Sequence, residues 1–130
     1  PQSPGARPRP LAIFLVEDNE DSARSLADLL ELDGHTVEIF PEPDAALEAL
    51  RERQPALLIC DIGLPGMTGY DFIRTVRQTD WGARLFAVAM TGYAQPEDRL
   101  QAAYAGFDAH LAKPPSFDEL ARVLLRASAE

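Results

Sequence analysis

Polar side chains that could carry out chemistry follow short apolar runs at four places in the chain. These side chains are Glu17 and Asp18 after the first run, then Asp61, Thr91 and Lys113 after later ones. At the end of a buried strand, such residues have the wrong polarity for a hydrophobic core. They are therefore candidates for a functional site.

Three of these residues are acidic, and they suit a divalent cation. Carboxylates held close together repel one another unless a hard cation bound through oxygen ligands offsets their charge, and Mg2+ is the natural candidate. Mg2+ bound by few carboxylates keeps positions open for water and phosphate oxygens, so Glu17, Asp18 and Asp61 predict a phosphoryl-transfer site. Asp61 is best placed to act as the nucleophile, which would give an aspartyl phosphate.

The other polar residues suit the binding of a phosphate group. Lys113 offers a compact positive charge for one phosphate oxygen, and Thr91 offers a hydroxyl donor for another. The backbone after Asp61 can add amide protons. The set could therefore bind a cation, hold a phosphate and attack phosphorus.

The elements that must position these residues follow a βα rhythm. Apolar or alternating runs predict five strands, over residues 11–16, 36–40, 56–60, 85–90 and 109–112. Segments with helical periodicity lie between them, which predicts an α/β fold: one (βα)5 unit with helices on both faces of a doubly wound parallel sheet. Ligands of open α/β sheets lie outside the carboxyl ends of the strands, so the polar residues would meet in one pocket.

Local signals mark the ends of the helices. Gly34 stands where a left-handed cap is wanted, and Pro43 and Pro96 stand where a helix begins. Ser116 and Glu119 form a capping-box pattern before the last helix. The apolar stripe expected on that helix consists of Phe117, Leu120, Ala121, Leu124 and Leu125.

The length of 130 residues suits one compact domain. Residues 1–10 contain four prolines and no hydrophobic cluster, which predicts an extended linker, and the folded domain is expected over residues 11–130. The start without Met indicates a piece of a longer polypeptide or a processed chain.

The net charge of −9, from 21 acidic and 12 basic residues, would repel nucleic acids and anionic membranes. Direct contact with either is not expected. Cys60 is the single cysteine, so an internal disulfide is excluded. We expect Cys60 to be a small buried hydrophobic residue. No apolar run approaches the ~20 residues that span a bilayer. We expect a cytoplasmic domain, although a parent chain could be anchored in a membrane.

The sequence resembles the receiver domain of bacterial response regulators and hybrid histidine kinases from residue 11 to about residue 126. The resemblance rests on VEDN at 16–19, LICDIGLPGMTG at 58–69, MTGY at 90–93 and AKP at 112–114. Each motif alone is weak. Together they are specific, because four elements occur in the right order at the ends of the right strands.

The resemblance implies a flavodoxin-like sheet of order 2-1-3-4-5 and phosphorylation of Asp61 by a phosphohistidine. It also implies a cis peptide between Lys113 and Pro114. The Mg2+ ligands would be Asp18, Asp61, Glu17, directly or through water, and the main-chain carbonyl of Gly63.

The resemblance also implies a conformational switch. Capture of the phosphate by Thr91 would draw the following loop inward, and the residue at the aromatic switch position, here His110, would fill the space. Gly63 and Tyr93 occupy the two positions that tune dephosphorylation. His110 could instead only fill space or face solvent, and Gly63 and Tyr93 could be ordinary loop residues.

Receivers fused to hybrid sensor kinases are the most similar in these motifs. The phosphoryl group would then come from a histidine of the same chain or pass to a phosphotransfer protein, and the parent chain would be a histidine kinase. The domain itself would be a phosphoacceptor with its own self-phosphorylation and dephosphorylation chemistry. The alternative is a stand-alone or output-linked regulator that binds a partner or forms a homodimer through its fourth and fifth helices.

Readings from other classes meet specific obstacles. A flavodoxin-like nucleotide or flavin binder needs a Gly/Ser/Thr-rich phosphate loop, and the three acidic residues of the segment 17–20 would repel a bare phosphate. A haloacid-dehalogenase-type phosphatase needs an aspartate where Gly63 stands. A receiver-shaped module that is never phosphorylated tends to lose its acidic residues, and this chain keeps them.

The remaining polar and aromatic candidates have structural explanations. His35 lacks a Cys or His partner at ligand spacing, so a metal site there is not expected. Trp81 is expected to pack at an edge. Arg74, Arg77 and Arg84 are expected to form a solvated face.

Overall fold

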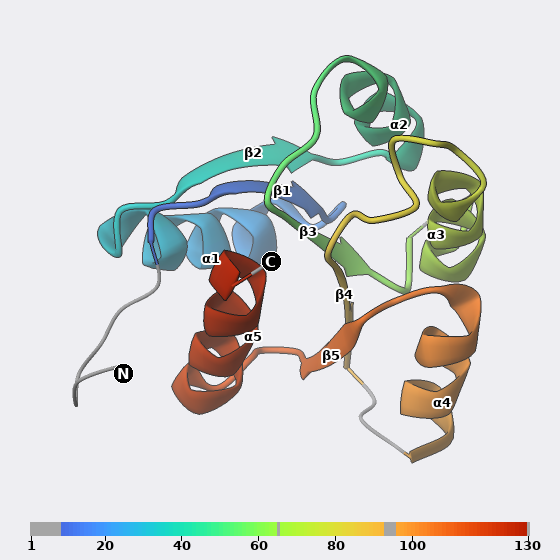
Figure 1. Cartoon of the computed structure of the whole chain (residues 1–130). Helices are drawn as coiled ribbons and strands as arrows, with labels where there is room; N and C mark the ends of the chain where they lie inside the picture. The colour runs from blue at the N-terminus through green and yellow to red at the C-terminus, as the bar shows by residue number, and fades with distance from the viewer. Residues whose placement is uncertain (1–8, 65, 93–95, 130) are drawn as a thin grey trace.

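The computed structural model describes residues 9–64, 66–92 and 96–129, in which five strands alternate with five helices (Figure 1). The elements are β1 (Ala12–Val16), α1 (Glu20–Leu32), β2 (Thr36–Phe40), α2 (Pro43–Glu52), β3 (Leu57–Asp61), α3 (Gly69–Arg77), β4 (Ala87–Thr91), α4 (Pro96–Ala105), β5 (Ala109–Ala112) and α5 (Phe117–Ala129). All strand pairs are parallel, in the order β2-β1-β3-β4-β5. The expected fold class and strand order are confirmed.

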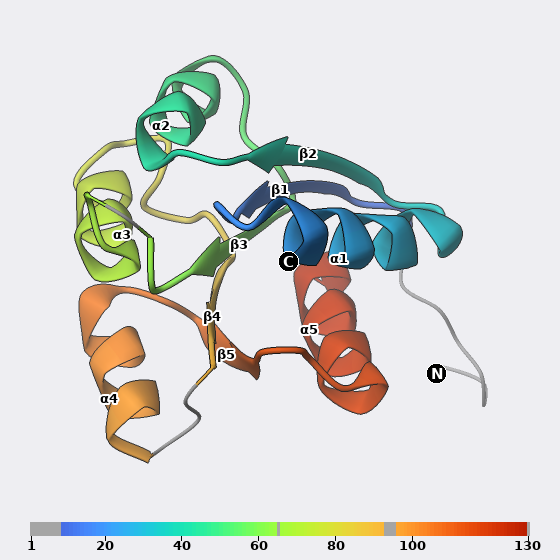
Figure 2. The ribbon, with the colours of Figure 1, turned by 180° about the vertical axis from the view of Figure 1, so that it is seen from behind.

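The sheet is the middle of three layers, with α1 and α5 on one face and α2, α3 and α4 on the other (Figure 1, Figure 2). Each face has its own hydrophobic core. The central strand β3 is buried at all five positions, whereas the edge strand β2 alternates between exposed and covered residues. This difference explains why β3 reads as a continuous apolar run and β2 does not.

The local signals for helix ends are confirmed. Gly34 has φ +94°, a left-handed conformation that favours glycine, and its amide donates to the carbonyl of Glu31 at 3.0 Å. α2 and α4 begin at Pro43 and Pro96. At α5, the Ser116 hydroxyl accepts from the Glu119 amide at 3.1 Å, and the Glu119 carboxylate accepts from the Ser116 amide.

The expected stripe on α5 was partly wrong. Phe117 is 75% exposed and Ala121 is also exposed. The buried residues of α5 are Leu120, Val123, Leu124 and Ala127. Their spacing is that of a helix whose apolar face turns toward the sheet, rotated about the helix axis relative to the predicted stripe.

Arg77 does not belong to a solvated face, and this expectation was wrong. Its side chain is only 19% exposed. It donates to the carbonyl oxygens of Gly82 at 2.9 Å, Leu85 at 2.6 Å and Gly106 at 2.8 Å, and to Asp108 Oδ2 at 2.9 Å. It therefore links the end of α3 to the segments that precede β4 and β5.

His35 is buried at the start of β2, where its Nδ1 accepts the amide proton of Leu11 at 3.0 Å. Burial lowers the pKa of His35, and the charge of Asp33 opposes this effect. Trp81 packs against the core at its edge, as expected, and Cys60 is fully buried.

Arg9 lies close to the end of α5, where its Nε donates to the carbonyl of Ser128 at 3.0 Å. Most of the expected linker lies outside the described residues. Within the part of the chain that the structure describes, no helix is both long and apolar enough to cross a membrane.

Candidate functional site

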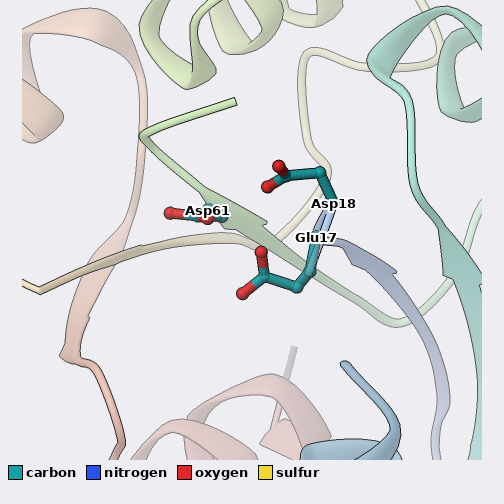
Figure 3. A group of neighbouring side chains, drawn as sticks. All are labelled: Glu17, Asp18 and Asp61. Atoms are coloured by element: carbon teal, nitrogen blue, oxygen red, sulfur yellow. The ribbon is translucent and has the colours of Figure 1, made fainter. Parts of the chain in front are cut away.

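The carboxyl ends of β1 and β3 bring the acidic residues together. Val16 pairs with Cys60, so Glu17 and Asp61 leave the two strands at the same level of the sheet. Figure 3 shows Glu17 and Asp18 at the end of β1 and Asp61 at the end of β3. One carboxylate oxygen from each of the three residues lies within 4.8 Å of the other two.

Lys113, which follows β5, reaches the same cluster from 52 residues further along the chain. Its Nζ lies 3.1 Å from Asp61 Oδ2 and 2.5 Å from Glu17 Oε1. Burial alone would lower the pKa of Lys113, but the hydrogen bonds and charges of Glu17 and Asp61 outweigh burial and raise it. The ammonium group is therefore held in its charged form. The peptide bond from Lys113 to Pro114 is cis, as expected.

The three carboxylates differ in their environment. Glu17 is 1% exposed and Asp61 is 7% exposed, whereas Asp18 faces solvent. Burial raises the pKa of Glu17; the hydrogen bond from Lys113 opposes this shift, and the neighbouring Asp61 adds to it. The site thus holds two buried carboxylates against one ammonium group, and a further positive charge would stabilise it.

The loop after β3 fixes the orientation of Asp61. The amide of Gly63 donates to Asp61 Oδ1 at 3.1 Å, while Lys113 occupies Oδ2, so the two carboxylate oxygens have separate partners. Gly69 begins α3 directly against this loop. A Cβ at position 69 would lie 2.8 Å from the carbonyl oxygen of Asp61 and 2.8 Å from Ile62 Cα, so only glycine permits this approach.

Thr91 and His110 lie on the strands beyond Asp61. Asp61 pairs with Met90, which places Thr91 at the end of β4, beside the end of β3 where Asp61 lies. His110 lies on β5, paired with Ala89. The structure thus brings Glu17, Asp18, Asp61, Thr91 and Lys113 to one edge of the sheet; Tyr93 lies outside the described residues.

The donor set fits Mg2+. Hard oxygen ligands from few carboxylates are what this ion takes in proteins, and the three acidic side chains converge within reach of one ion. The excess of buried negative charge supplies the attraction. Whether the carbonyl of Gly63 is a ligand stays a prediction.

The chain matches the model of the response regulator receiver domain over residues 13–125. It belongs to this family. Among curated relatives, it is 38% identical over 112 residues to an uncharacterised 14.6 kDa protein of Leptolyngbya boryana, covering 86% of each chain. It is 34% identical over 110 residues to the two-component response regulator PhoP of Pseudomonas aeruginosa, covering 85% of this chain but only 48% of PhoP. The chain thus spans about half the length of some relatives, and two-component phosphoacceptor signalling is the function of the domain.

A solved structure similar to this receiver is the receiver domain of the sensor histidine kinase PA1611 from Pseudomonas aeruginosa PAO1. Its TM-score is 0.84 at 29% identity, covering 93% of this chain and 99% of the other. In that structure a magnesium ion is coordinated in the active site cleft. This neighbour and the acidic cluster point to the same cation.

Sequence reasoning missed a groove of about 440 Å³ beside the acidic cluster. The groove lies between α1 and the segment that joins β5 to α5. It is lined by Asp21, Ser22, Ser25, Leu26, Leu29, Met90, Lys113, Pro114 and Pro115. No single motif signals it, because its walls come from segments about 90 residues apart in the chain.

Proposed function

We propose that Asp61 accepts a phosphoryl group from a phosphohistidine in a Mg2+-dependent reaction. The observation that carries the proposal is the placement of Asp61, buried in an acidic cluster and held from two sides by Lys113 and the amide of Gly63. Such an arrangement orients a nucleophile and supplies donors for the oxygens of the transferred group.

The chemistry is an in-line displacement at phosphorus. An oxygen of the Asp61 carboxylate attacks the phosphorus atom, the P–N bond to the donor imidazole breaks, and the leaving imidazole keeps the bonding electron pair. When bound, Mg2+ would offset the charge of the phosphoryl oxygens. Glu17 and Asp18 would hold that ion, while Lys113 would exchange part of its contact with the carboxylates for a phosphoryl oxygen.

Thr91 would supply a hydroxyl donor to the phosphoryl group, and His110 would fill the space left by the movement of Thr91. The position of Thr91 next to Asp61 across the β3–β4 pair supports the first role. Gly63 and Tyr93 are proposed to set the lifetime of the phosphoryl group. A Cβ at position 63 would lie 3.9 Å from Asp61 Oδ1, so a side chain there would border the reacting oxygen.

The groove between α1 and the β5–α5 segment is the proposed docking surface for the phosphodonor. It ends at Lys113, so a partner lying in it would have its own reactive group beside the acidic cluster. Leu26, Leu29 and the two prolines give the groove an apolar floor, as a partner helix would require. The partner would be a histidine kinase or a phosphotransfer protein.

For the parent protein we propose a hybrid sensor histidine kinase, with this domain in the cytoplasm. The similarity to the PA1611 receiver supports this assignment. The similarity to PhoP supports the alternative, a stand-alone or output-linked regulator. Leu100 and Tyr104 on α4 and Phe117 on α5 are exposed, which favours partner binding or a homodimer through these two helices in the alternative case.

The test is phosphorylation of the purified domain with acetyl phosphate and Mg2+, followed by intact mass. The wild type should gain one phosphoryl group and Asp61→Asn should gain none. Asp71→Asn, which removes an exposed carboxylate of α3, is the matched control and should react like the wild type. An unmodified wild type, or a modified Asp61→Asn, would contradict the proposal.

Asp18→Ala should weaken Mg2+ binding, and an unchanged Mg2+ affinity would contradict the assignment of Asp18 as a ligand.

A further inference from the structure

His110 and Thr91 share one face of the sheet. Thr91 pairs with Ala112 and Ala89 pairs with His110, and residues two apart on a strand project to the same side. Ala89 belongs to the core covered by α2, α3 and α4. His110 therefore projects beneath α4, one strand away from Thr91.

The position of the His110 imidazole favours its uncharged form. Both ring nitrogens are sealed from solvent, and neither has a hydrogen-bond partner among the described residues. A buried polar atom without a partner is costly, and a buried imidazolium without one is far more costly. His110 is half-buried as a residue, but both ring nitrogens lie on its buried side, so this position favours the neutral ring over the protonated one.

Charged groups surround this ring from two helices. α4 contributes Asp98 and Arg99, and α5 contributes Glu119. Burial lowers the pKa of His110, Arg99 acts in the same direction, and the two carboxylates oppose them. The two carboxylates favour the charged form of the ring and Arg99 disfavours it, so Asp98 and Glu119 are the groups toward which a protonated ring would be drawn.

We propose that His110 makes the phosphorylation switch sensitive to pH: its neutral ring occupies the interior beside Thr91, and its protonated ring is expelled toward Asp98 and Glu119. The proposal rests on the proposed function of Asp61. When Thr91 moves toward the phosphoryl group, the interior position of the ring becomes part of the activated conformation. Protonation and activation then oppose each other, and linkage requires the effect to be reciprocal.

The direct test follows the imidazole signals by NMR in the intact chain, which has only two histidines. His110→Phe identifies the His110 signal by its disappearance. We expect the midpoint of the His110 titration to shift to lower pH when beryllofluoride and Mg2+ are added. An unchanged midpoint, with Asp61-dependent beryllofluoride binding demonstrated in the same sample, would overturn the proposal.

The second test measures beryllofluoride affinity at pH 7.5 and pH 5.5 for the wild type and His110→Phe. Titration of the acidic cluster affects both proteins equally, so the ratio of their affinity losses between the two pH values gives the contribution of His110 alone. The wild type should lose ~2–10-fold more affinity than His110→Phe, since a midpoint difference of one pH unit corresponds to about tenfold. Equal losses would overturn the pH dependence. Absence of binding in both proteins at pH 7.5 would instead overturn the proposed function, and the pH switch with it.

Discussion

Replacement of Arg77 should destabilise the domain far more than replacement of Arg74 on the same helix. Arg77→Met removes the hydrogen bonds from Arg77 to the carbonyl oxygens of Gly82, Leu85 and Gly106, and its bond to Asp108 Oδ2, which keeps the Ala87 amide as a donor. At about 1 kcal/mol for each of the three carbonyl hydrogen bonds lost, and with the ion pair discounted because Asp108 is accessible to water, the free energy of unfolding should fall by ~3 kcal/mol. For a domain of this size that loss corresponds to a fall in Tm of about 10 °C.

Equilibrium unfolding in urea at pH 7 measures this difference. Arg74→Met is the matched control, because Arg74 and its partner Asp71 are 54% and 61% exposed. Its cost should be at most ~0.5 kcal/mol. Arg77→Lys keeps the charge but loses the planar fork, and it should fall between the two. If Arg77→Met and Arg74→Met were equally stable, the reasoning from the Arg77 contacts would be refuted.

Three further predictions concern His35, Gly69 and Gly63. The buried His35 accepts a hydrogen bond from the Leu11 amide and has a lowered pKa, so its contribution to stability is present above about pH 6.5 and is lost as the pH falls through the folded-state pKa. Urea midpoints at several pH values should therefore fall more steeply on acidification for the wild type than for His35→Gln. Gly69→Ala should cost ~1–3 kcal/mol in urea unfolding and slow phosphorylation, because the new Cβ would collide with the backbone of Asp61. Gly63→Ala should change stability by ~0.5 kcal/mol or less but lengthen the lifetime of the phosphoryl group, followed by intact mass after removal of the donor.

Each of these predictions has a contrary result. Parallel pH profiles for the wild type and His35→Gln would show that the imidazole does not titrate with unfolding. A Gly69→Ala variant of native stability would mean that α3 can move away from Asp61. An unchanged lifetime in Gly63→Ala would mean that position 63 does not govern the access of water.

The strands could be predicted because their signal is local. The run Leu57–Asp61 is apolar until its last residue. A buried strand that ends in an aspartate can be predicted from such a run alone, without knowledge of the neighbouring strands. The order of the strands came from the family resemblance instead. Hydrophobic periodicity predicts which residues are buried, but it does not predict which strands are neighbours in the sheet.

The features that sequence reasoning missed depend on tertiary contacts. The sequence predicts that Arg77 is a basic residue at the end of a helix. It does not predict the carbonyl and carboxylate partners of Arg77, because they lie up to 31 residues away in the chain. On α5 the error was one of rotation. Phe117 and Val123 both fit an amphipathic pattern, and the way the helix lies on the sheet decides which of them is buried.

The ammonium of Lys113 meets a carboxylate 52 residues earlier in the chain, and this separation also bears on folding. The pocket forms only after distant parallel strands have paired, so a partly folded chain has no site for the cation. A ligand that binds only the folded state shifts the folding equilibrium by mass action, by about 2.7 kcal/mol at a concentration one hundred times its Kd. Because the carboxylates repel one another when no cation is bound, the free energy of unfolding should depend in part on the Mg2+ concentration.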